Sequence, residues 1–120
     1  MSEAQSTPDR EGRTAHDLTA FQQTILTVLA EEARYGLAVK GELEEYYGNE
    51  VNHGRLYPNL DDLVERDLIA KSELDKRTNE YELTNEGYEL LLGELNWEVS
   101  KIVTGEERAD DIGQLLDDAA

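Results

Sequence analysis

The sequence has 120 residues and a formal net charge of -17, because 28 acidic side chains stand against only 11 Lys and Arg residues. A chain of this length forms one domain with a modest core. The sequence contains no cysteine, which excludes disulfides, thiolate metal sites and a thiol redox sensor. It also has no apolar run of membrane-spanning length and no signal-peptide pattern, so we expect a soluble, cytoplasmic protein.

The acidic charge is unevenly distributed. Residues 34–77 hold seven basic and ten acidic side chains, whereas the rest of the chain holds four basic and eighteen acidic ones. An acidic excess normally argues against a nucleic-acid partner, because DNA is itself a dense array of negative charge. Here the excess lies mainly outside residues 34–77, and it is typical of a halophilic cytoplasm, where carboxylates keep a surface hydrated. A surface that binds a basic partner is the alternative.

The N-terminal residues 1–13 are polar and lack an apolar period, which predicts a disordered arm. From His16 onward, apolar residues recur at helical spacing, which predicts a first helix that ends near Glu32. A second helix is predicted for Leu37–Tyr47, since Gly48 and Asn49 follow it as stop signals. Four of its side chains are expected to point inward: Leu37, Val39, Leu43 and Tyr46.

Residues 51–84 combine an amphipathic helix with a hairpin. Asn52 is a favoured helix cap, and Leu56, Leu60 and Leu63 recur after it at helical spacing. After Ile69 the period changes to two, which predicts two strands joined by the polar turn 75–79. A helix followed by a hairpin with a basic tip is the winged-helix pattern. We therefore predict a mainly α fold with a small β-hairpin, in which residues 14–84 form a winged helix-turn-helix domain.

The C-terminal part, residues 85–120, is predicted to form dimerisation helices. Thr84 caps a long helix through Val103 that carries apolar residues on two opposite faces. One face is expected to meet its own domain and the other a second subunit, and the sequence leaves open which does which. A short acidic helix follows. The predicted dimer interface comprises Leu18, Phe21, Leu92, Leu95, Trp97, Val99 and Ile102.

An ordered set of short motifs resembles the PadR group of winged-helix transcriptional regulators. The set consists of Tyr35-Gly36, the run 54–58, Leu68-Ile69, the run 81–84 and Gly87, and the resemblance covers roughly residues 18–104. The acidic composition is similar to that of members from halophilic archaea, and the resemblance there implies a regulator of the oxidative-stress response. One departure is Asp67, where the family more often has glycine at a helix end that favours positive φ. Aspartate tolerates that conformation better than most residues, so we expect the turn to form.

The resemblance implies that the helix after Asn52 enters the major groove of DNA. Arginine can bind guanine through two hydrogen bonds, and asparagine can do the same for adenine. Cations at a wing tip suit phosphate or minor-groove contact. An ordinary exposed helix face and a solvated turn are the alternatives. The predicted DNA-binding residues are Asn52, His53, Arg55, Asn59, Lys76 and Arg77, with Lys71, Arg34 and Lys40 at the edge of the footprint.

The expected partners are double-stranded DNA and a second copy of the chain, with neither a small-molecule ligand nor a membrane. We expect no metal or cofactor, apart from salt cations such as K⁺ that screen carboxylates at the DNA interface. A winged-helix module that binds another protein of the transcription machinery is the alternative function. An enzyme is not expected, because the sequence has no cysteine, two distant histidines and no phosphate-binding glycine loop.

Overall fold

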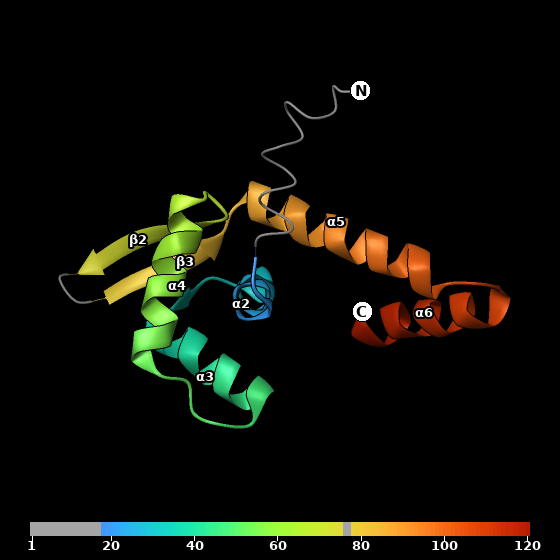
Figure 1. Cartoon of the computed structure of the whole chain (residues 1–120), viewed down its shortest axis with the longest axis horizontal. Coiled ribbons are helices and arrows are strands. Elements are labelled where there is room, and N and C mark those ends of the chain that lie inside the picture. The colour runs from blue at the N-terminus through green and yellow to red at the C-terminus, as the bar shows by residue number, and fades with distance from the viewer. Residues whose placement is uncertain (1–17, 76–77) are drawn as a thin grey trace, which may run out of the picture.

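The computed structural model describes residues 18–75 and 78–120 (Figure 1). The predicted arm 1–13 lies outside the described residues, as do Lys76 and Arg77 at the predicted wing tip. The elements in chain order are α2 (Ala20–Glu31), β1 (Arg34–Tyr35), α3 (Gly36–Tyr47), α4 (His53–Glu65), β2 (Ile69–Asp75), β3 (Thr78–Leu83), α5 (Asn85–Ile102) and α6 (Glu106–Ala119). The prediction of a mainly α chain with a hairpin is confirmed.

The sheet is antiparallel, with strand order β1-β3-β2. Ile69 pairs with Leu83 and Lys71 pairs with Tyr81, so β2 and β3 form the predicted hairpin. The short strand β1, which the sequence did not indicate, pairs Arg34 with Tyr81 on the other side of β3. Figure 1 shows this hairpin extending to one side of α4, while α5 leaves toward the opposite side and α6 folds back beneath it.

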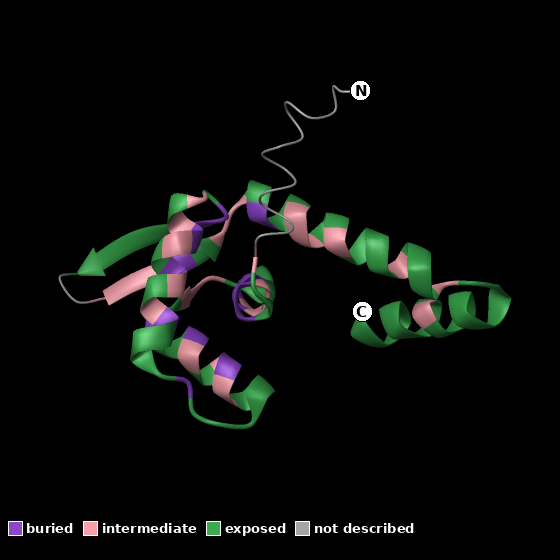
Figure 2. Ribbon diagram, viewed as in Figure 1, coloured by how far each residue is buried: buried purple, intermediate pink, exposed green. Residues whose placement is uncertain are grey.

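The core lies among α2, α3, α4 and the base of the hairpin. Figure 2 shows buried residues in these elements and at the start of α5, whereas the rest of α5 and α6 is mainly exposed. Helical spacing places one apolar stripe of each helix on the core. The buried apolar side chains are Phe21, Ile25, Leu26, Leu29, Val39, Leu43, Val51, Leu56, Leu60, Leu63, Leu68, Ile69 and Tyr81.

Local capping signals set several helix ends. Thr19, Asn52 and Thr84 precede α2, α4 and α5, and each side-chain oxygen accepts a hydrogen bond from a backbone N–H of the first turn. Each cap satisfies a donor that the helix itself leaves unpaired. Gly48 ends α3 in the left-handed conformation with φ of 79°. The caps predicted at Asn52 and Thr84 and the stop at Gly48 are confirmed.

The turn after α4 has the left-handed residue that the sequence predicted. Asp67 has φ of 64°. Its N–H donates to the carbonyl of Val64, and the N–H of Leu68 donates to the carbonyl of Leu63, both at 3.0 Å. This pair of bonds is the Schellman arrangement that glycine normally closes. The hydroxyl of Thr84 also donates to the carbonyl of Asp67 at 2.7 Å, which ties the turn to the start of α5.

Two residues of α3 do not point inward as predicted. Leu37 is 67% exposed and Tyr46 is 71% exposed. At about 100° per residue, Leu37 lies roughly 160° around the helix from the buried Val39. Tyr46 lies in the last turn of α3, where its ring packs edge-on against Tyr47 with centroids 5.0 Å apart. The prediction for Val39 and Leu43 is confirmed.

The long helix α5 meets its own domain only near its beginning. Gly87 is buried against the carbonyl group of Leu68, and an added β-carbon would overlap that oxygen. Leu90 and Leu91 pack against the core. Most of the large apolar side chains farther along this arm of α5 and α6 are exposed: Tyr88, Leu92, Leu95, Trp97 and Ile102 on α5, with Leu115 and Leu116 on α6. Among the described helices, none is both long and apolar enough to cross a membrane.

Candidate nucleic-acid interface

The N-terminal half of α4 presents polar groups at the protein surface. The side-chain oxygen of Asn52 accepts a hydrogen bond from Gly54 N at 2.5 Å, which fixes the start of the helix. The exposed ring of His53 stacks on Tyr57, with centroids 5.5 Å apart. Tyr57 in turn lies against Gly36 at the start of α3, where a β-carbon would overlap its hydroxyl group. The first turn of α4 is therefore held against the first turn of α3.

Arg55 is exposed, and it is supported by a neighbouring helix. Its guanidinium carbon lies 3.9 Å from the centre of the Phe21 ring on α2. Such a cation–π contact contributes about 0.5–1 kcal/mol at a surface site. The Phe21 ring is only 3% exposed and also stacks on Tyr47, so it belongs to the core of its own chain. Phe21 was predicted to lie on the dimer interface; within its own chain the ring supports Arg55.

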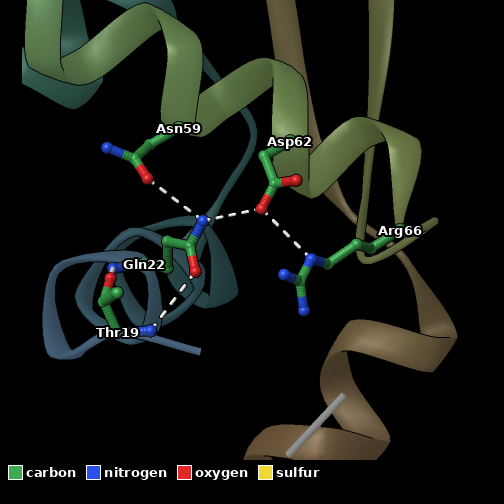
Figure 3. A network of polar contacts seen from close by, with 5 residues as sticks. All are labelled: Thr19, Gln22, Asn59, Asp62 and Arg66. Carbon is green, nitrogen blue, oxygen red and sulfur yellow. Dashed lines mark hydrogen bonds and ion pairs between the residues drawn. The ribbon is translucent and has the colours of Figure 1, made fainter. Parts of the chain in front are cut away.

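Both the oxygen and the nitrogen of the Asn59 side-chain amide form hydrogen bonds within the chain. The carbonyl oxygen accepts from Gln22 Nε2 at 3.0 Å, and the amide nitrogen donates to the backbone carbonyl of Arg55 at 2.7 Å. Gln22 Nε2 also donates to Asp62 at 2.8 Å, and Arg66 donates to the same carboxylate at 3.1 Å (Figure 3). Two-point binding of adenine needs both groups of an asparagine amide. In the chain by itself the Asn59 side chain joins α4 to α2, so its predicted role in reading adenine would require these hydrogen bonds to be exchanged.

Arg34 forms ion pairs with carboxylates of its own chain. Its guanidinium pairs with Glu31 at 2.5 Å, Glu32 at 3.5 Å and Glu42 at 3.7 Å, and the side chain is only 12% exposed. Releasing it would leave three neighbouring carboxylates without their cation, and a nearly buried charge that loses its partners is strongly disfavoured. These contacts join β1 to α2 and α3, and the predicted contact of Arg34 with phosphate would have to replace them.

Lys40 also forms an ion pair within its own chain. Its amine lies 3.0 Å from Glu44, which also accepts from the backbone N–H of Val51 at 3.0 Å. The Val51 hydrogen bond and then the Lys40 contact hold the pKa of Glu44 below its usual value. Lys71, in contrast, lies exposed on β2 of the wing. The structure thus keeps Asn52, His53, Arg55 and Lys71 at the surface.

The hydrogen bonds of Gln22 were not predicted from the sequence, although two sequence features indicate them. Thr19 and Gln22 have the spacing of a capping box, and both of its reciprocal bonds form. Gln22 also lies on the buried side of α2, among the apolar residues Ile25, Leu26 and Leu29. A polar side chain at a core-facing position must find a hydrogen-bond partner, so its presence there indicates a specific contact between helices.

The remaining candidates for the dimer interface lie on the arm and beside α2. Leu18 is half-buried and packs against the core, and Val99 is half-buried on α5. Leu92, Leu95, Trp97 and Ile102 are between 46% and 60% exposed. We call these exposed residues, together with Tyr88 on the same helix, the arm surface; Tyr88, Leu92, Leu95 and Ile102 lie on one side of α5 and Trp97 lies on the other. The helix that carries the arm surface, α5, extends away from the wing (Figure 1).

Three helices, the last of which is followed by a two-stranded wing, define a winged helix-turn-helix protein that binds DNA. The model of the transcriptional regulator PadR-like family matches residues 25–92. The chain belongs to this family, so it is a DNA-binding transcriptional regulator and not an enzyme.

The chain is similar to several solved structures. It is 64% identical to H. salinarum RosR crystallised from NaBr, with a TM-score of 0.85, and the match covers 88% of this chain and 96% of RosR. The complex hsRosR-S4 matches at 64% identity with a TM-score of 0.86, covering 88% of this chain and 91% of the other. A PadR-like transcription factor from Bacteroides fragilis shares the fold, with 23% identity, a TM-score of 0.58 and coverage of 83% and 89%. No curated protein matches the chain.

Proposed function

We propose that this protein is a homodimeric, sequence-specific regulator in which the N-terminal half of α4 reads base edges in the major groove. The observation that carries the proposal is the exposed Arg55 on its Phe21 support. Between Glu50 and Asp61 the sequence has no carboxylate, so the N-terminal half of α4 carries no acid of its own in a strongly acidic chain. Asn52 and His53 flank Arg55, while Lys71 and the wing-tip cations Lys76 and Arg77 suit the DNA backbone.

The arm surface supports the homodimer. Monomeric proteins rarely leave a large contiguous apolar patch exposed, and such patches mark interaction sites. Tyr88, Leu92, Leu95 and Ile102 share one side of α5. Trp97 lies on the opposite side, in line with Leu90, beyond the part of the helix where Leu90 and Leu91 pack against the core. In this proposal α5 and α6 (residues 85–120) of one chain pack against those of a second copy, and Leu18 lies near the edge of this contact. Pairing would place two α4 helices on successive turns of one groove, about 34 Å apart.

The biological setting is proposed from charge and similarity. A net charge of -17 suits a cytoplasm rich in KCl, where carboxylates remain hydrated and screened. The identity of 64% to H. salinarum RosR supports the same halophilic setting and the role in oxidative stress implied by the sequence resemblance. In this setting K⁺ screens the carboxylates near Arg55 when they approach the duplex. Because the sequence has no cysteine, any response to oxidant uses other chemistry than a thiol.

Selection from a random duplex library in molar KCl tests this function. The expected result is a two-fold symmetric consensus with half-site centres about one helical turn apart. Enrichment of no sequence above background would contradict sequence-specific binding and favour the alternative module that binds protein. Mapping of bound genomic sites with and without oxidant then tests the stress role, which fails if occupancy is the same in both conditions.

A further inference from the structure

One buried side chain on α2 is bonded to two positions of the candidate recognition helix. Gln22 is 5% exposed, and both hydrogens of its amide are donated across to α4, one to Asn59 and one to Asp62 (Figure 3). Its carbonyl oxygen accepts from the backbone N–H of Thr19 at 3.2 Å. A single amide thus joins the cap of α2 to the middle of α4.

The bonding pattern restrains orientation as well as position. An apolar residue in this place would bury area equally well over a range of rotations of α4, because hydrophobic contact has no direction. An amide bonded at 3.0 Å and 2.8 Å is satisfied only when two particular oxygens face it. Rotating α4 about its axis would leave a buried polar group unpaired, which costs more than a hydrogen bond contributes.

The adjacent residue acts on the same helix one turn earlier. Phe21 supports the Arg55 guanidinium, and Gln22 holds Asn59 and Asp62. Arg66 extends the bonded set toward the end of α4. Since α2 also packs against α5, it is the element that connects the recognition helix with the arm.

We infer that Gln22 is a positioning residue, which sets the rotation of α4 so that Arg55 faces the floor of the groove. This inference rests on the proposed function of α4. Gln22 itself is buried and touches no DNA in this arrangement, so its effect falls on discrimination between sequences. Contacts to phosphate from the wing tolerate small rotations of α4, which means that affinity for unrelated DNA does not depend on Gln22.

The test compares two duplexes, the consensus selected by the wild-type protein and a scrambled version of it, in the same KCl buffer. For Gln22→Leu the ratio of the two affinities is expected to fall about tenfold, within the range of one lost base contact. Affinity for the scrambled duplex is expected to stay within twofold of wild type. Gln23→Leu is the matched control, since Gln23 is the next residue along α2 and is only half-buried; its ratio should match wild type.

Gln22→Glu gives a second readout that general loosening of the core would not produce. When protonated, the introduced carboxyl group can donate to Asp62 as the amide does. When ionised, it repels Asp62, and this repulsion raises the pKa of the introduced group. The charged and polar groups around it are Asp62, Arg66, Asn59 and Thr19. The ratio of affinities is expected to recover as the pH falls from 8 toward about 5, relative to wild type in the same buffers.

The outcomes separate this inference from the proposed function. If the wild-type protein selects a consensus but folded Gln22→Leu keeps the full ratio, or loses no more of it than Gln23→Leu, the inference is overturned. If circular dichroism shows that Gln22→Leu is unfolded, the pH profile of Gln22→Glu decides: recovery at low pH supports the inference, and a flat profile overturns it. If the wild-type protein selects no consensus, the proposed function itself fails.

Discussion

The guanidinium carbon of Arg55 lies 3.9 Å from the centre of the Phe21 ring, so a residue of α2 supports the α4 side chain best suited to bind guanine. This contact restricts a long side chain that would otherwise sample many rotamers. A restricted side chain loses less conformational entropy when it binds. The position of Arg55 is therefore set by packing of the core as well as by the helix that carries it.

Arg55→Ala is predicted to reduce discrimination between the selected consensus and scrambled DNA by about 1–3 kcal/mol. Arg55→Lys keeps the charge but loses the planar, two-point donor, so it should recover affinity for scrambled DNA without recovering the ratio. Competition binding at fixed KCl measures both quantities. An Arg55→Ala variant with an unchanged ratio would exclude base reading by this residue.

The arm surface yields a prediction about assembly. Leu95→Glu and Trp97→Glu are each expected to dissociate or unfold the protein, because a second subunit would bury the introduced charge at a cost of several kcal/mol. In a single chain these residues are 53% and 60% exposed, so the substitutions would be nearly neutral in a monomer. Light scattering in high salt measures the mass. The control Asn96→Glu adds the same charge at an exposed polar position between them. If both folded test variants keep the mass of the wild-type dimer, burial of these residues by a second subunit is refuted.

Gly87 is predicted to be essential for the junction between α4, the wing and α5. In Gly87→Ala the added β-carbon would overlap the carbonyl of Leu68, which is backbone and cannot move aside as a flexible side chain would. We expect a loss of about 1–3 kcal/mol in the free energy of unfolding. In Gly41→Ala a β-carbon would meet open space among the described residues, so this control should gain up to about 1 kcal/mol from helix propensity. Denaturant titration in one high-salt buffer compares the two, and equal stabilities would contradict the packing argument.

A substitution at Asp67 is predicted to stabilise the protein, in contrast to Gly87→Ala. Its φ of 64° lies in the left-handed region that glycine occupies without a steric penalty. Asp67→Gly is therefore expected to raise the melting temperature, with a gain of about 0.5–1 kcal/mol, while Asp67→Ala should lower it. Thermal unfolding followed by circular dichroism orders the three proteins. A melting temperature for Asp67→Gly below that of wild type would show that the aspartate stabilises the turn in another way.

The charge distribution predicts an unusual dependence of DNA affinity on salt. A basic regulator loses affinity as salt rises, with a slope of about -0.9 per neutralised phosphate. Here Arg34 and Lys40 are paired with carboxylates of their own chain, which leaves few cations to release counterions from DNA. Screening over a Debye length of about 3 Å at about 1 M removes repulsion between nearby carboxylates and phosphates. Affinity should therefore change little, or rise, between dilute and molar KCl.

Unfolding of the acidic chain at low salt could produce the same trend, because self-repulsion destabilises a compact state of high net charge. Circular dichroism in the same buffers separates the two effects. A protein that stays folded throughout, yet loses affinity as steeply as a basic winged-helix protein of similar footprint, would refute the screening argument.

The helices, the caps at Asn52 and Thr84, the hairpin and the left-handed turn at Asp67 could be predicted from the sequence. These features depend on side-chain periods of 3.6 and 2 and on hydrogen bonds between near neighbours, so they are written into short stretches of chain. The motif order was also sufficient to indicate the PadR resemblance. The direction of Leu37 and Tyr46 was not determined, because a long apolar residue near a helix end is buried only if another element reaches it.

The contacts that polar side chains make within the folded chain could not be predicted from the sequence. Arg34 and Asn59 have suitable chemistry, yet one is surrounded by carboxylates and the other is bonded to Gln22, 37 residues away in the sequence. Phe21 became a support for Arg55 for the same reason. Helical period tells which face a residue occupies, but a hydrogen bond or ion pair depends on distances between segments that meet only when the chain is folded.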